Sequence, residues 1–205
     1  VFPNLEFMDI DFDQVRKWLL NNTAKYRMHR LNVLTLSCVK SRELLCQFLY
    51  RMPNLEKLNL FRTDHLLKES SAPCLVTVLQ LKELVLSISR IKDLGFEGDP
   101  ILQRLELLTL NSCYDLIKLT PPSVSLSYLT YLEVKHCGLK NLIASLTAKS
   151  LVQLKTMKVG HCGYTKEIVT NEGNEEKDIE IVFNNLITIE LDTLKCLTSF
   201  CSYGT

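Results

Sequence analysis

The 205-residue sequence has no excess of charge of either sign. It holds 24 lysines and arginines against 23 aspartates and glutamates, a net charge of +1. General nucleic-acid binders carry a basic excess, so this balance disfavours nucleic acid as a partner. The sequence also lacks an uninterrupted apolar run of about 18 residues, as a membrane span would need, and lacks a signal-peptide pattern at its start. The expected location is therefore cytoplasmic.

Catalytic motifs are missing as well. The sequence contains no G-x-S-x-G, no P-loop and no H-E-x-x-H, and we therefore expect neither an enzyme nor a cofactor site in these residues. Asp9, Asp11 and Asp13 alternate as in a calcium loop, but the glycine and the distant glutamate of an EF-hand are absent. We interpret the three aspartates as one polar face of a strand and expect no metal.

What the sequence does contain is a repeated pattern. Residues 129–137 read L-x-x-L-x-V-x-x-C, and the same pattern recurs at 105–113 and 154–162. The alternating apolar residues predict a short strand, and the cysteine closes the turn that follows it. With weaker copies, the repeats begin at positions 5, 31, 55, 81, 105, 129, 154 and 186, so the steps are 26, 24, 26, 24, 24, 25 and 32 residues. All but the last lie within the roughly 20 to 29 residues of a leucine-rich repeat.

This pattern predicts an α/β fold, a leucine-rich-repeat solenoid of about eight irregular repeats over residues 1–205. We expect a curved horseshoe with a parallel β-sheet on its concave face, and with short helices, 3-10 turns and loops on its convex face. Short helices are expected at 15–20 and, after Ser41, at 42–49. Because Val1 stands directly at the opening of a repeat, without a polar capping segment, we expect a fragment of a longer chain.

Three cysteines share one position of the repeat, namely Cys113, Cys137 and Cys162. We interpret them as buried thiols of a reduced chain rather than as parts of a disulfide framework. A zinc site built from His136-Cys137 and His161-Cys162 is not expected, because the strand pleat places the cysteines inside and the histidines outside.

The last repeat is lengthened by an acidic segment. Residues 170–180 include the run Asn171-Glu172-Gly173-Asn174-Glu175-Glu176-Lys177-Asp178, which has no apolar residue. Such a run predicts a surface loop inserted on the convex side.

Residues that alternate with the inward leucines should line the concave face and could bind a partner. Lys135, Lys155 and Lys158, with His136 and His161, make the sixth and seventh strands basic in this prediction, which would suit an acidic patch on a protein partner. The complete set of partner-binding candidates is Lys57, Phe61, Arg62, Tyr131, Lys135, His136, Lys155, Lys158 and His161.

The C-terminal half, residues 101–203, resembles a known family. The similarity lies in the run Tyr128–Cys137, in Val159-Gly160-His161-Cys162, in the acidic segment between Glu167-Ile168-Val169 and Ile181-Val182-Phe183, and in the ending Phe200-Cys201-Ser202. These elements resemble the C-terminal repeats of plant intracellular disease-resistance proteins, the nucleotide-binding leucine-rich-repeat (NB-LRR) receptors of the coiled-coil class.

The resemblance implies a protein-recognition and autoinhibitory module of innate immunity. In that family the repeats sense a pathogen effector directly or through a guarded host protein, and they restrain the nucleotide-binding domain of the same chain. ADP or ATP would bind only that domain, which these residues do not contain. An alternative is the substrate-recognition domain of an F-box ubiquitin-ligase adaptor; the irregular steps and the acidic insertion favour the receptor.

Overall fold

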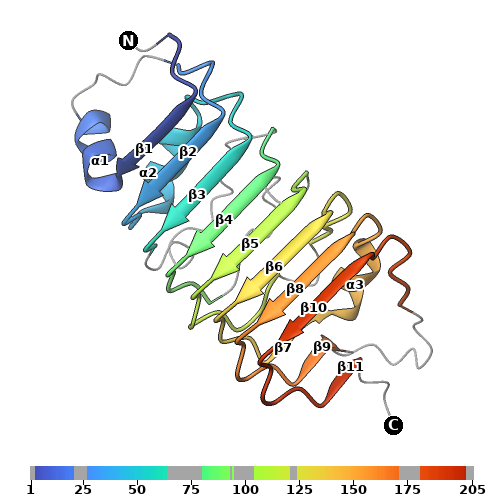
Figure 1. Cartoon of the computed structure of the whole chain (residues 1–205). Helices are drawn as coiled ribbons and strands as arrows, with labels where there is room; N and C mark the ends of the chain where they lie inside the picture. Colours follow the sequence, from blue (N-terminus) through green and yellow to red (C-terminus); the bar gives the residue numbers. More distant parts are fainter. Residues whose placement is uncertain are drawn as a thin grey trace.

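The repeats form one continuous parallel sheet. The computed structural model describes residues 3–20, 27–63, 80–92, 94, 104–120, 124–170 and 181–201. Eight five-residue strands pair in parallel in the order β1-β2-β3-β4-β5-β6-β8-β10 and stack like rungs along the molecule (Figure 1). They are β1 (Phe7–Asp11), β2 (Val33–Ser37), β3 (Lys57–Phe61), β4 (Glu83–Ser87), β5 (Leu107–Asn111), β6 (Tyr131–Lys135), β8 (Thr156–Gly160) and β10 (Thr188–Asp192).

The predicted register of the repeat is confirmed in every strand. Equivalent positions pair across each interface, as in Leu34 with Leu58 and Leu108 with Leu132. The inward side chains form the core, where Leu132 and Val134 of β6 are fully buried. Removing this apolar surface from water is the main stabilising term, because each repeat buries its leucines against those of its neighbours. The leucine-rich-repeat solenoid is therefore the observed fold.

The edge strand β10 departs from this pattern. Its inward residues Ile189 and Leu191 remain 45% and 41% exposed. An edge strand has a neighbouring strand on one side only, so its apolar side chains are only half covered.

Each strand of the main sheet from β2 onward ends in a backbone turn of one kind. The residue that follows the strand has a positive φ, between 49° and 59°, in Cys38, Arg62, Ile88, Ser112, His136, His161 and Thr193. The next residue turns inward and is buried in six repeats, as Val39, Thr63, Ser89, Cys113, Cys137 and Cys162. Cys113, Cys137 and Cys162 are free thiols, as predicted.

Cys46 corrects one part of the cysteine prediction. This cysteine is disulfide-bonded, so the expectation of a fully reduced chain is wrong at this position. The prediction rested on the shared register of the other cysteines, and Cys46 lies outside that register, on a helix.

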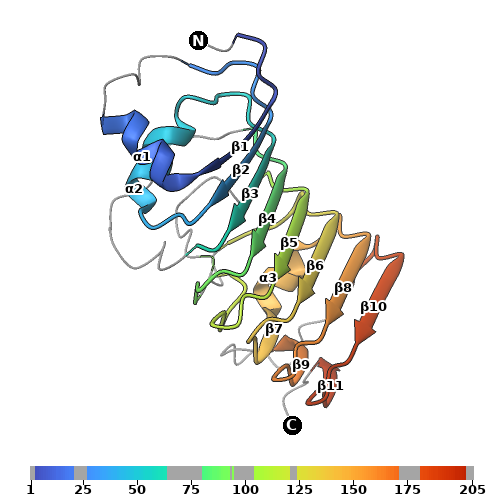
Figure 2. The same cartoon turned by 60° about the vertical axis from the view of Figure 1, so that its left-hand side comes forward.

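The helices lie to one side of the main sheet (Figure 2). They are α1 (Phe12–Leu20), α2 (Arg42–Leu49) and α3 (Ser145–Ser150). Ser41 caps α2 as predicted, since its side chain accepts a hydrogen bond from the Leu44 amide. Within the described residues, no helix is long and apolar enough to cross a membrane.

Helix α1 begins earlier than predicted because Asp11 caps it. The Asp11 carboxylate accepts hydrogen bonds from the Asp13 amide at 2.9 Å and from the Ser37 hydroxyl at 3.2 Å. The amide hydrogen bond lowers the pKa of Asp11. Asp11 therefore acts as the N-cap of α1.

A second, smaller sheet follows on the far side of the C-terminal repeats. Its strands are β7 (Asn141–Ala144), β9 (Glu167–Thr170) and β11 (Ser199–Cys201), paired in parallel in the order β11-β9-β7. This sheet was not predicted. The predicted acidic loop lies outside the described residues except for Thr170, the last residue of β9.

Candidate interaction surface

The concave face of β6 carries a compact polar network. Tyr131, Glu133 and Lys135 alternate along the strand and point outward together. The Tyr131 hydroxyl donates to one carboxylate oxygen of Glu133 at 2.7 Å, and the Lys135 ammonium pairs with the other oxygen. Burial, followed by the interaction with Glu133, raises the pKa of Tyr131 to about 12.

Glu133 is the centre of that network. Burial acts to raise its pKa, but the hydrogen bonds from Lys135 and Tyr131 and the charge of Lys158 together lower the pKa below its usual value. Glu133 therefore stays ionised at neutral pH and holds its two partners on β6 in place.

The row of charges continues across the neighbouring strands. Glu133 stands beside Lys158 of β8, and Lys158 beside Glu190 of β10, because these residues share one register position. The Lys158 ammonium lies 2.8 Å from the Glu190 carboxylate. Lys135 and Lys158 thus both have carboxylate partners, and the face is a network of mixed charge rather than the simple basic patch expected from the lysines. Lys155, just before β8, is exposed.

Two histidines extend this face beyond the strand ends. The rings of His136 and His161 stack with their centroids 4.6 Å apart and their planes 3° from parallel. The His161 Nε2 lies 3.3 Å from the Asp192 carboxylate. Both rings are exposed, while the adjacent Cys137 and Cys162 are buried. The histidines and cysteines therefore face opposite sides of the backbone, as predicted.

Gly160 contributes no side chain to the outer row of this face. A β-carbon on Gly160 would lie 3.5 Å from Cγ of Lys135 and 3.9 Å from Cβ of Asp192. The sequence pattern suggested an exposed position, but Gly160 is buried because the Lys135 side chain lies over it.

The remaining candidates form a separate group around β3. The Lys57 ammonium lies 2.8 Å from the Glu83 carboxylate, and the Arg62 guanidinium lies 5.2 Å from the centroid of the Phe61 ring. Strands β4 and β5 separate this group from β6. The nine sequence candidates thus form two groups on one face, not a single site.

The sequence prediction missed the carboxylates that organise both groups. Glu83, Glu133, Glu190 and Asp192 hold the lysines and a histidine of the candidate set. The signal was available, because aligning the repeats places Glu133 next to Lys158 and Lys158 next to Glu190. The lysines and histidines taken alone predict a basic patch, because their carboxylate partners lie mostly on neighbouring strands.

Comparison with known proteins gives a match to the C-terminal half of the chain, which carries the network on β6, β8 and β10. Residues 103–203 match the family model of plant disease resistance protein RPS2-like leucine-rich repeats. No curated protein and no solved structure matches the chain. The matched segment includes β6, β8 and β10 and the whole second sheet. The segment that carries the mixed-charge network therefore has the sequence character of the leucine-rich repeats of a plant disease-resistance protein.

Proposed function

We propose that this chain is the recognition module of a plant innate immune receptor of the NB-LRR class, acting through protein binding and not through catalysis. In this role the repeats sense a pathogen effector, directly or through a guarded host protein, and restrain the nucleotide-binding domain of the parent chain. The proposal places the protein in the cytoplasm. It assigns ADP or ATP to the parent chain's nucleotide-binding domain.

The observation that carries the proposal is the continuous concave sheet with the mixed-charge network on β6, β8 and β10. Eight strands at a spacing of about 4.8 Å offer a ribbon roughly 34 Å wide, the scale of a protein partner. Its side chains are held by one another before any partner arrives, which reduces the entropy lost on binding.

Specificity on such a face comes from the arrangement of its charges. A partner must present a lysine or arginine where Glu190 is exposed and a carboxylate near Lys155, and a partner with the opposite arrangement is repelled. The family match to residues 103–203 favours the receptor over the F-box adaptor.

The first test is to read the transcript upstream of the Val1 codon. An open frame that encodes a P-loop would support the receptor, and an F-box segment there would contradict it. The second test introduces Lys158→Glu into that full-length receptor. The cell-death response in leaf tissue, measured in the absence and in the presence of the effector, should differ from that of the wild type. The reason is that Lys158→Glu replaces the positive charge between Glu133 and Glu190 by a negative one.

The control is Lys149→Glu, since Lys149 is exposed on α3, away from the concave face. Protein abundance is measured in parallel. Equal cell-death responses of both variants at equal abundance would contradict a role for the concave network.

A further inference from the structure

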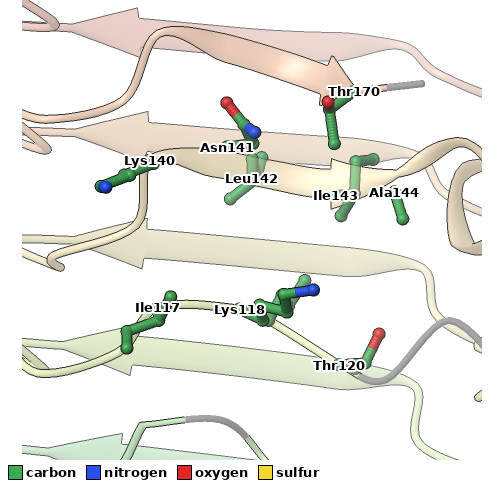
Figure 3. Close-up of a pocket in the computed structure, with 10 residues that line it drawn as sticks. Ile117, Lys118, Thr120, Lys140, Asn141, Leu142, Ile143, Ala144 and Thr170 are labelled. Atoms are coloured by element: carbon green, nitrogen blue, oxygen red, sulfur yellow. The ribbon is translucent and has the colours of Figure 1, made fainter. Parts of the chain in front are cut away.

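A small cavity lies outside the concave face, between repeats five and six. It has a volume of about 120 Å³ and is lined by the extended segment 117–120 on one side and by β7 on the other, with Thr170 of β9 beside it (Figure 3). The buried side chains of Leu119, Leu142 and Ile143 form apolar walls, and Ile117 is 51% exposed at its edge.

Within the described residues, no backbone hydrogen bond joins segment 117–120 to β7 across this cavity. Segment 117–120 is joined to the preceding repeat, since the Ile117 amide donates to the Lys92 carbonyl at 2.7 Å. Beyond the gap, the Lys166 amide donates to the Lys140 carbonyl at 2.7 Å, and β7 pairs with β9. Strand β7 is thus the edge of the second sheet, and its outer side faces the cavity.

Four lysines lie at or near this opening, and Glu167 of β9 stands beside the lining residue Asn141 in the register of the second sheet. Lys118 and Lys140 line the cavity, and the backbone bonds above place Lys92 and Lys166 at matching positions of the flanking repeats. All four lysines are exposed. Within the described part of the chain, no carboxylate lies within ion-pair distance of Lys92, Lys140 or Lys166, in contrast to Lys135 and Lys158 on the concave face.

The size of the cavity narrows the choice of ligand. Pockets for drug-sized molecules measure roughly 300–1,000 Å³, so this cavity is too small for such a molecule. An apolar cavity of about 150 Å³ holds benzene. The available volume therefore suits one branched aliphatic side chain.

We propose that this cavity anchors a single leucine or isoleucine side chain of an acidic segment of a protein partner. The anchor would contact Ile117 and Leu119, while carboxylates next to it in the partner's sequence would pair with Lys140 and the lysines of the flanking repeats. A buried aliphatic anchor gives such a contact its affinity, and the surrounding charges give its orientation. The proposal does not depend on the concave face.

The test uses the 205-residue chain and the fluorescent peptide Asp-Glu-Leu-Glu-Asp at low ionic strength. Binding is followed by fluorescence anisotropy, and methyl NMR of Ile117, Leu119 and Ile143 locates the bound peptide. We expect saturable binding with shifts at these methyl groups. Replacing the peptide's leucine by alanine should weaken binding by roughly tenfold or more, the usual effect of removing methylenes from an apolar pocket.

Two variants of the chain separate the anchor from the charges. Lys140→Glu should weaken binding and reduce its salt dependence, and Ile117→Ser should weaken binding without changing the salt dependence. Lys40→Glu is the matched control, because it makes the same charge change at an exposed residue of the second repeat, far along the sheet from the cavity, and it should leave binding unchanged. Both Lys140 and Ile117 are exposed, so their variants should keep the wild-type melting temperature.

Several results would overturn the proposal. Equal affinity of the leucine and alanine peptides would show a purely electrostatic contact. Equal weakening by Lys140→Glu and Lys40→Glu would show that only total charge matters, and methyl shifts confined to the concave face would place the peptide elsewhere. Displacement of the peptide by an RNA oligonucleotide of equal charge, at equal concentration, would identify a general polyanion surface instead.

Discussion

Gly138 lies directly against the backbone carbonyl of Tyr114 in the preceding repeat. A β-carbon on Gly138 would stand 1.9 Å from the Tyr114 carbonyl oxygen and 2.9 Å from the carbonyl carbon. The Gly138 amide also donates a hydrogen bond to the Cys113 carbonyl at 3.2 Å. Repeats five and six can approach this closely only because residue 138 has no side chain.

The first prediction concerns that contact. Gly138→Ala should lower the free energy of unfolding by about 1–3 kcal/mol, the usual cost of overpacking, because the obstacle is backbone and cannot swing away. Gly163→Ala is the control: it changes the equivalent residue of the next repeat, where a β-carbon meets nothing within 4 Å. That change should stay within about 0.5 kcal/mol. Urea unfolding measures the free energy of unfolding of both variants. Equal losses of stability would contradict the close approach of Gly138 to the Tyr114 carbonyl.

A second prediction tests the inward register of the strands. Leu132→Asp should abolish cooperative unfolding, because it removes a fully buried leucine and buries an unpaired charge, each costing several kcal/mol. Thr156→Asp makes a similar change on the outward side of the neighbouring strand and should leave a cooperative transition. Circular dichroism during heating distinguishes them. A soluble Leu132→Asp variant with a sharp melting transition would refute the assigned register.

The buried position after each strand supports a third prediction. At Cys137 the thiol donates to the Lys135 carbonyl at 3.2 Å, and the Ser89 hydroxyl donates to the Ser87 carbonyl at the same distance in repeat four. Cys137→Ser should therefore cost only about 1 kcal/mol, because the hydroxyl finds the same acceptor.

Cys137→Leu should be less stable than the serine variant, because the added carbons overfill the turn. Chemical denaturation gives both values. The opposite order of stability would show that the turn has room for a side chain larger than cysteine at position 137.

The fourth prediction concerns pH. The pKa of Glu133 is lowered in the folded protein, so Glu133 adds stability above the pKa of an unfolded glutamate, and this contribution is lost as pH falls through the folded value. Lys135→Met removes the largest of the lowering interactions, so the pKa of Glu133 should rise. Carboxyl NMR titration measures the pKa, and Lys149→Met is the control. An unchanged Glu133 pKa in Lys135→Met would contradict the ion pair.

The main sheet could be predicted from the sequence because the repeated leucine pattern indicates both where each strand lies and how neighbouring strands align. The spacing of the leucines gives each strand, and the repetition of that spacing aligns Leu132 with Leu108 and Met157. Both follow from burial of apolar side chains, which a single sequence displays.

The second sheet could not be predicted in the same way. Strands β9 and β11 have four and three residues, and the segments that connect them to the main sheet vary in length. Their pairing depends on where each repeat's return segment lies beside its neighbour, which no local pattern specifies. The closeness of Gly138 to Tyr114 depends on the same long-range placement.

The candidate surface was predicted at the level of which residues face outward, but not at the level of its charge. Lys135 and Lys158 were placed on the concave face, while their pairing with Glu133 and Glu190 requires the geometry across strands. The sequence alone does not show that either lysine has a partner, whereas in the folded sheet each lysine forms an ion pair with a carboxylate.

The one-strand-per-repeat sheet also determines how the molecule should come apart. Each strand bonds only to the repeats on either side, so stability is transmitted from neighbour to neighbour and not through a common centre. Hydrogen exchange should therefore be slowest in the amides of β4 and β5, the middle strands of the sheet, and should quicken toward β1 and β10, as opening spreads inward by fraying. A lesion at β1 would shorten the ordered array, whereas a lesion between repeats five and six would divide it into two unequal parts that open separately.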